Sequence, residues 1–448
     1  MVMRSIEADY VIIGAGAMGM AFADEILTRS DTSIAIIDAH AKPGGHWNDA
    51  YPFVHLHQPS SFYGVNSKEL GSGEIDQIGW NAGLSELASV DEVVAYFDQV
   101  MRQRFLPSGR VQYLPRAHYE KGKARLLTSQ KTIDVRARKS VVDATYMKVA
   151  VPSVTPPKYD IADGVRVIAP NELPSVAQTD GGYVIVGAGK TAIDAVLWLL
   201  ANQVAPEEIK WIMPRDSWFL NRAMTQPGEK FRIGEHIEII AKANAPEEVF
   251  EQLEATQHFL RLNRDFAPTM YRCATVSLAE VEQLRLIKNV IRKGRVKRIE
   301  PSRIGLAQGD IAAHSDAIYI NCTADGLAPR DPVAVFKPGH ITLQALVGCQ
   351  QVFSAAMLGA IETLSDTSLE EKNKLAAVIP HPSTPIDFFK MTAGFIMNFA
   401  VWSSIPELSA WLKDSRLSVF GSARKTPDPA IGITALQKLQ AFSEQAAA

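Results

Sequence analysis

Two glycine-rich turns, about 170 residues apart, constrain the fold of this chain more than any other feature. The first lies in VIIGAGAMGMAFADEIL, which begins at Val11, and the second in YVIVGAGKTAIDAVLWLL, which begins at Tyr183. In both, a short apolar stretch precedes the glycines and a helical pattern follows them. A buried strand, a tight turn and a helix in this order begin a βαβ unit. The chain is therefore expected to contain two such units.

The first turn has the spacing G-x-G-x-x-G at Gly14, Gly16 and Gly19. The first glycine permits the tight turn, the second lets a pyrophosphate approach the backbone, and the third lets the helix pack closely on the strand. The N–H groups at the start of the helix, from about Met18 to Arg29, would point at that phosphate. The next strand pattern, SIAIID, ends in Asp38, where an acid binds a ribose hydroxyl.

The second turn reads G-x-G-x-x-A at Gly187, Gly189 and Ala192, and Lys190 and Thr191 begin the helix that follows. Its next strand, IKWIM, leads to Arg215 and has no acid in the ribose position. A guanidinium pairs with a 2′-phosphate that a carboxylate would repel, which favours NADPH over NADH. The alternative is that Arg215 is an ordinary solvated charge at a strand end.

Together the two turns predict a pair of cofactors. The turn with a terminal acid suits FAD, and the turn with a terminal arginine suits NADPH. A chain that binds both is suited to pass a hydride from a nicotinamide to a flavin.

The segment AKPGGHWNDAYPFVHLHQPSSFYGVNSKELG, which follows Asp38, carries a G-G-x-W element formed by Gly44, Gly45 and Trp47. It resembles the flavin-dependent monooxygenases with two dinucleotide-binding domains, which include flavin-containing and Baeyer–Villiger monooxygenases and N-hydroxylases. VVDATYMKVAVP and DAIYINCTADG are similar to the segments that connect the two domains in that family. The resemblance covers about residues 8–360.

The resemblance implies an FAD-dependent, NADPH-consuming monooxygenase that acts on a small organic substrate and O₂ through a C4a-(hydro)peroxyflavin. It places Asn66, from VNSKEL, near the reactive face of the flavin and Trp47 beside the ring, so these two are the predicted catalytic residues. The F-x-G-x-x-x-H fingerprint of the family is absent before the second turn. A reductase or oxidase without oxygen transfer, or a flavin-binding redox module without turnover, therefore stays open.

Several further residues are predicted to contact the cofactors, with a hydrogen bond to the loop backbone as the alternative for Gln58 and helix capping as the alternative for Gln350. They are Gly45, His46, His57, Gln58 and Gln350. His55 and His57 would share one face if VHLH were a strand. No carboxylate cluster accompanies them, so a flavin or substrate contact or a structural role is favoured over a metal, and no metal site is predicted.

The expected fold class is α/β, with two Rossmann-like (three-layer ββα) dinucleotide-binding domains. Residues 1–150 would form the first part of a discontinuous FAD domain, 151–182 a linker, and 183–325 an NADPH domain with a helical insertion at about 243–292. Residues 326–448 would complete the FAD domain and add C-terminal helices. Among them, FFKMTAGFIMNFAVW predicts a buried helix, with a membrane-dipping or tunnel-lining helix as the alternative.

Net charge and cysteine content limit the binding partners and the cellular compartment that we expect. A net charge of −3 gives no reason to expect nucleic acid as a partner, and no apolar run is long enough for a membrane span. The cysteines Cys273, Cys322 and Cys349 are few, odd in number and far apart, and no C-x-x-C exists. This pattern argues for a reducing compartment and against a disulfide framework, with Cys322 and Cys349 as inert core thiols. Cytoplasmic localisation is the prediction, and the oligomeric state is left open.

Overall fold

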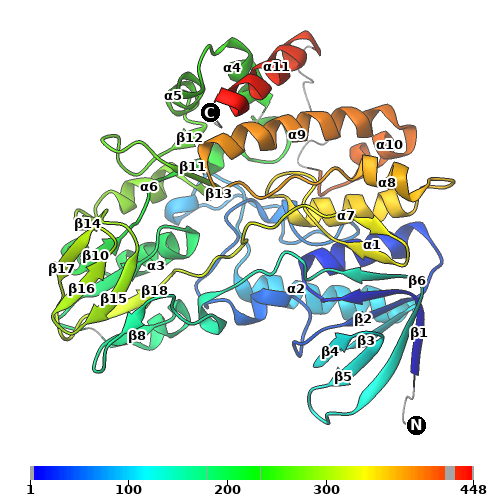
Figure 1. The fold of residues 1–448 in the computed structure, drawn as a ribbon, viewed down its shortest axis with the longest axis horizontal. Coiled ribbons are helices and arrows are strands. Elements are labelled where there is room, and N and C mark those ends of the chain that lie inside the picture. Colours follow the sequence, from blue (N-terminus) through cyan, green and yellow to red (C-terminus); the bar gives the residue numbers. More distant parts are fainter. Residues whose placement is uncertain (1–4, 178, 233, 419–428, 446–448) are drawn as a thin grey trace.

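The computed structural model describes residues 5–177, 179–232, 234–418 and 429–445. Two parallel sheets form its framework, one in each half of the molecule (Figure 1). The first has the order β19-β20-β6-β1-β2-β3. Its strands are β1 (Ser5–Ile13), β2 (Ile34–Ile37), β3 (Val111–Leu114), β6 (Thr132–Asp143), β19 (Phe336–Lys337) and β20 (His340–Thr342). Because β20 pairs with β6 across nearly 200 residues of chain, the first domain is discontinuous, as predicted.

Both faces of the first sheet are covered, which explains the continuous apolar run of β1. Ile12 faces the helices α1 (Ala17–Arg29) and α7 (Gln351–Glu362), which pack side by side. Val11 faces an antiparallel layer in which β4 (Ala117–Glu120) and β5 (Lys123–Leu126) pair with the start of β6. The helix α2 (Val90–Val100) begins at a Ser89–Glu92 capping box. This is the three-layer arrangement that the sequence predicts.

The second sheet repeats the design of the first. Its order is β14-β10-β9-β18-β8, with all neighbours parallel. The strands are β8 (Arg166–Ile168), β9 (Tyr183–Val186), β10 (Ile209–Ile212), β14 (Val290–Ile291) and β18 (Ile318–Asn321). The helix α3 (Lys190–Ala201) covers one face. The other face packs on a sheet of β7 (Asp160–Ile161), β15 (Val296–Glu300), β16 (Arg303–Leu306) and β17 (Gly309–Ala312).

Two boundaries differ from the prediction. The expected linker at 151–182 contains β7 and β8, which pair with β15 and β18 and so belong to the sheets of the second domain. The expected helical insertion at 243–292 does contain α5 (Pro246–Ala255) and α6 (Leu278–Leu284), and α4 (Gly234–Lys242) precedes it. It also contains β12 (Phe259–Leu260), β13 (Met270–Val276) and β14. The reason is a third sheet, in which β12 and β13 pair with β11 (Ser217–Asn221) and bury MYRCATV as a strand.

Four helices end the described chain: α8 (Leu369–Leu375), α9 (Pro385–Ser404), α10 (Pro406–Asp414) and α11 (Pro429–Gln445). The FFKMTAGFIMNFAVW segment forms most of α9, which starts at a Thr384–Asp387 capping box. Phe388 and Trp402 are buried, whereas Met397 and Val401 are exposed, so α9 is a half-buried helix. It lies against α11 (Figure 1). Across the described ranges, no helix combines the length and the apolar character needed to cross a membrane.

The close packing at the first turn predicts how a substitution of Gly19 changes stability. A Cβ on Gly19 would lie 2.1 Å from the Gly14 carbonyl oxygen, so Gly19→Ala forces α1 away from β1. We expect the free energy of unfolding to fall by about 2–3 kcal/mol. Gly189→Ala is the control, because its φ is −87° and nothing lies within 4 Å of the added atom. Urea unfolding followed by circular dichroism measures both, and an equal loss in the two variants would contradict the packing role of Gly19.

Candidate functional site

The first glycine turn has the backbone shape of an anion site. Gly14 has a φ of +101°, and α1 begins after the N-cap Gly16 with no side-chain cap on its first amides. The loop of the G-G-x-W element crosses this turn, since the Gly44 amide donates to the Ala15 carbonyl (2.8 Å). A Cβ on Gly45 would lie 2.9 Å from the Gly16 Cα. The uncapped amides of α1 are suited to a phosphate.

Asp38 lies at this turn, as predicted, but its carboxylate already has partners. Its Oδ2 accepts the Ala15 amide (2.5 Å), and its Oδ1 accepts the amide (2.6 Å) and Nδ1 (3.1 Å) of His40. His40 Nε2 contacts Asp49 (2.8 Å). The bonds to Asp38 and Asp49 raise the pKa of His40 to about 9, so it is cationic at neutral pH. Asp38 thus ties β2 to the glycine turn, and its predicted contact with a ribose stays a prediction.

The second glycine turn is more open than the first. Gly187 has a φ of +135°, and a Cβ there would meet the Cys322 carbonyl oxygen at 2.5 Å, so only glycine fits. Gly189 is exposed with open space around it. Lys190 pairs with Asp194, which also accepts from the Tyr51 hydroxyl (2.7 Å) of the first domain. Thr191 is also close to Tyr51. The turn leaves room for a pyrophosphate over Gly189 and α3.

Arg215 is exposed at the carboxyl end of β10. It makes no hydrogen bond or ion pair with any other residue in the described part of the chain. The neighbouring Asp216 is buried and pairs with Arg292 (2.7 Å), so the acid closest to Arg215 is already neutralised. This leaves the guanidinium available to an anion.

The loop after the first turn holds Trp47 and His46 against the first domain. Trp47 is buried, and its Nε1 donates to the Tyr63 hydroxyl (2.8 Å). His46 stacks on Trp47, with ring centroids 5.6 Å apart. Burial lowers the pKa of His46 to about 4, so the imidazole is neutral.

His57 and Gln58 reach across the molecule, whereas His55 does not. His57 Nδ1 accepts the Thr275 amide (3.1 Å) of the second domain, and burial lowers its pKa to about 3. Gln58 accepts from Gln350 Nε2 (2.8 Å), so two residues predicted from segments 292 positions apart meet directly. His55 is exposed and lies outside any strand, so the shared face expected for VHLH is wrong. In the described ranges no group of His, Cys, Asp and Glu has the arrangement of a metal site.

Asn66 is held in a buried network on α1 and α10. Its Nδ2 donates to Glu25 Oε1 (2.8 Å), and its Oδ1 accepts from the Ser415 hydroxyl (3.0 Å). The other Glu25 oxygen accepts Trp411 Nε1 (3.0 Å). Both ends of the amide are therefore engaged, which fits a structural role, and its predicted catalytic role stays a prediction.

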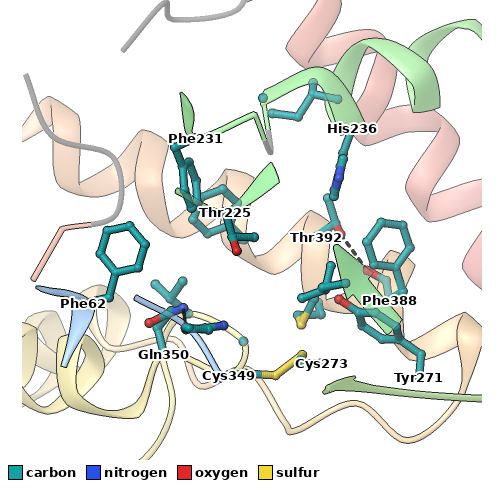
Figure 2. A pocket seen from close by; sticks show the side chains of 18 residues that line it. Phe62, Thr225, Phe231, His236, Tyr271, Cys273, Cys349, Gln350, Phe388 and Thr392 are labelled. Carbon is teal, nitrogen blue, oxygen red and sulfur yellow. Dashed lines mark hydrogen bonds between the residues drawn. A yellow bond between two sulfur atoms is a disulfide. The ribbon is translucent and has the colours of Figure 1, made fainter. Parts of the chain in front are cut away.

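A cavity, partly open to solvent, lies where the two domains meet (Figure 2). Its walls come from five segments: Gln58 and Phe62; Leu220, Thr225, Phe231, Gly234, His236 and Ile237; β13; 347–350; and the first half of α9. Its described lining includes no Asp, Glu, Lys or Arg. Such a site suits an uncharged, mainly apolar molecule.

His236 is the cavity residue that sequence reasoning missed most clearly. It is 4% exposed, and its Nε2 has no hydrogen-bond partner among the described residues. Burial and the nearby His258 lower its pKa to about 3. A neutral imidazole with a free nitrogen is able to bind one polar atom of a ligand. The segment around it has no motif, so no signal in the sequence points to this role.

Arg222 is not the surface charge that arginine usually provides. It is fully buried and pairs with Glu280 (2.9 Å) at the start of α6. It also donates to the His57 carbonyl (3.0 Å) and to Asn81 Oδ1 (2.9 Å) of the first domain. Arg222 therefore joins the domains beside the cavity.

The structure contradicts the prediction that the cysteines form no disulfide. Cys273 and Cys349 form a disulfide, with a Cα–Cα distance of 6.5 Å. The prediction failed because spacing along the chain, 76 residues here, does not report distance in the fold. Cys349 is thus not an inert thiol. Cys322 is buried and free, and burial raises its pKa, as expected of a core thiol.

Relatives of this chain occur in mycobacteria. The uncharacterized protein Rv2000 of Mycobacterium tuberculosis is 47% identical over 423 residues, which cover 93% of this chain and 78% of that protein. The uncharacterized protein Mb2023 of Mycobacterium bovis matches to the same extent. The chain belongs to their family.

Other matches are more distant. Residues 12–64 match the family model of an NAD(P)-binding Rossmann-like domain. A flavin-containing monooxygenase from Stenotrophomonas maltophilia is 18% identical with a TM-score of 0.48, covering 80% of this chain and 97% of that one. A polycyclic ketone monooxygenase from Thermothelomyces thermophila is 12% identical with a TM-score of 0.49, covering 99% and 89%. These sequence identities and TM-scores do not extend to the activity of this chain.

The buried Glu25 predicts a pH dependence of stability. Burial raises its pKa from 4.5 to about 7, so the folded protein binds more protons than the unfolded chain between these values. Stability from this group is therefore full below pH 4.5 and is lost as the pH rises through 7. Glu25→Gln, which cannot ionise, should lack this loss, so its stability relative to the wild type should rise by about 3 kcal/mol between pH 4.5 and 8.

Urea unfolding of the wild type and Glu25→Gln at several pH values measures this difference. Glu69→Gln, an exposed carboxylate in the neighbouring segment, is the control and should follow the wild type. A constant difference between Glu25→Gln and the wild type at all pH values would show that Glu25 titrates normally.

Proposed function

We propose that this protein is an FAD-dependent, NADPH-consuming oxidoreductase that acts as a single-component monooxygenase on a small, uncharged organic molecule. One observation carries the proposal. A single chain contains two complete Rossmann-like domains, and residues of both line one apolar cavity at their junction. That arrangement is suited to bringing two dinucleotides and a substrate together.

The residues present fit both cofactors. At the first turn, the uncapped amides of α1 and the close approach of Gly16 and Gly45 suit the pyrophosphate of FAD. At the second, the open space over Gly189 suits the pyrophosphate of NADPH. Arg215, exposed and without a partner in the described chain, suits its 2′-phosphate.

The chain itself supplies orientation and exclusion of water. When bound, flavin and NADPH supply the hydride transfer and the reaction with O₂. The amides of Gln58 and Gln350 meet at the cavity wall, where they would orient a flavin edge. The aromatic side chains of Phe62, Phe388 and Tyr271 make the wall of the same space apolar, and with cofactor and substrate bound they would help to exclude water. A dry site protects an oxygen-transfer reaction from loss of peroxide to water.

The purified protein is expected to bind FAD and to be bleached by NADPH under anaerobic conditions, because both half-sites are present. On addition of O₂ with an apolar substrate, NADPH oxidised should equal oxygenated product formed. Absorbance and mass spectrometry measure this. Complete release of the oxygen as hydrogen peroxide with every substrate would instead identify a reductase or oxidase. A colourless protein that does not take up FAD would refute the proposal.

The role of Arg215 predicts cofactor preference. Arg215→Glu removes a charge-assisted contact with the 2′-phosphate, so affinity for NADP⁺ should fall about 10–100-fold while affinity for NAD⁺ changes little. Isothermal titration measures both. Arg136→Glu on β6 makes the same charge change on an exposed residue of the first domain and should leave both affinities unchanged. An equal loss for NADP⁺ and NAD⁺ in Arg215→Glu would show that Arg215 does not read the 2′-phosphate.

A further inference from the structure

The Cys273–Cys349 disulfide lies in the wall of the cavity. Cys273 belongs to β13 of the second domain, and Cys349 lies just before α7 of the first. Figure 2 shows the bond between Gln350 and Tyr271, facing the space that the other side chains surround. The bond therefore joins the two domains at the point where a bound molecule would contact it.

The position of Cys349 relates the bond to the proposed flavin site. The next residue, Gln350, is the N-cap of α7 and bonds to Gln58. These two amides are the ones proposed to orient a flavin edge. Cys349 is thus adjacent in sequence to Gln350, and both cysteines line the same cavity as the two residues that would hold a two-electron carrier.

The backbone around Cys273 is held in an unusual conformation. Its φ is +55°, in the left-handed region that residues other than glycine rarely adopt. The pairing of β13 with β11 shifts register here, because three residues of β13 lie opposite Phe219 alone. Such strain persists only where the surroundings enforce it, and the cross-link to Cys349 is one such restraint. The state of the bond is therefore coupled to the shape of the cavity wall.

We infer that Cys273 and Cys349 form a second redox centre of the cavity, a disulfide that a two-electron donor bound there converts to two thiols. This inference rests on the proposed function, in which the donor is the reduced flavin. In the step, the sulfur–sulfur bond breaks and each sulfur gains one electron and one proton, while the reduced flavin, as FADH₂, gives up both electrons and both protons and becomes FAD.

Counting thiols after anaerobic treatment tests the inference. The holoprotein is mixed with excess NADPH and no thiol reagent, denatured in acid, alkylated and weighed by mass spectrometry. The wild type should rise from one alkylated cysteine, Cys322, to three. Cys322→Ser should rise from none to two, whereas Cys349→Ser should keep two throughout. The visible spectrum of bound FAD checks that each variant is folded.

The outcomes separate this inference from the proposed function. If NADPH bleaches the flavin and the wild type still shows one thiol, the redox centre is refuted while the function stands. If no FAD binds, the proposed function fails, and native protein is treated with dithiothreitol instead. Three thiols would then support a redox centre that is open to a donor in the cavity, and one thiol would refute it.

Discussion

A buried guanidinium holds the two domains together, and the cavity depends on it. Arg222 lies at the end of β11 in the second domain and bonds to the His57 carbonyl and Asn81 of the first. Its charge is balanced by Glu280, which also closes the capping box of α6 with Ser277. Removing one partner of such a buried pair costs about 3–5 kcal/mol, since the other charge is left uncompensated. Together with the Cys273–Cys349 disulfide, these polar contacts hold the two domains in position.

The parts of the fold that could be predicted are those fixed by neighbours in sequence. Gly14 and Gly187 each follow a strand and have φ values of +101° and +135°, and Gly19 in α1 faces the Gly14 carbonyl oxygen, which leaves no room for a Cβ. The spacing of the glycines therefore indicates the turn directly. The apolar runs Tyr10–Ile13 and Tyr183–Val186 are continuous because their strands are covered on both faces. Both Rossmann-like sheets followed from these local patterns, whereas the return of the chain to the first sheet followed from the resemblance of DAIYINCTADG to a segment of the flavin-dependent monooxygenases.

The parts that could not be predicted depend on residues that meet only in the folded chain. The sequence predicts a helical insertion at about 243–292, because the strand character of MYRCATV shows only in its pairing with β11. Cys273 and Cys349 are 76 residues apart and sit in unrelated elements, so nothing near either one indicates a bond. His236 is similar: its free nitrogen matters because five separate segments close a cavity around it. Pairing across segments, and not residue type, decides these features.

Charged side chains lie outside the cavity, whereas its described lining is uncharged. Burial keeps His57 and His236 neutral at physiological pH, and the described cavity lining has no carboxylate or ammonium group. Lys190 and Arg222 are close to this region, but each is paired with an acid. Arg215, outside the cavity, keeps its charge available at the surface. On the proposed function, the phosphates of the nucleotide would be bound by charge at the rim. The reacting groups would meet in a space of low dielectric constant, where the few dipoles present, such as the paired amides of Gln58 and Gln350, act without competition from water.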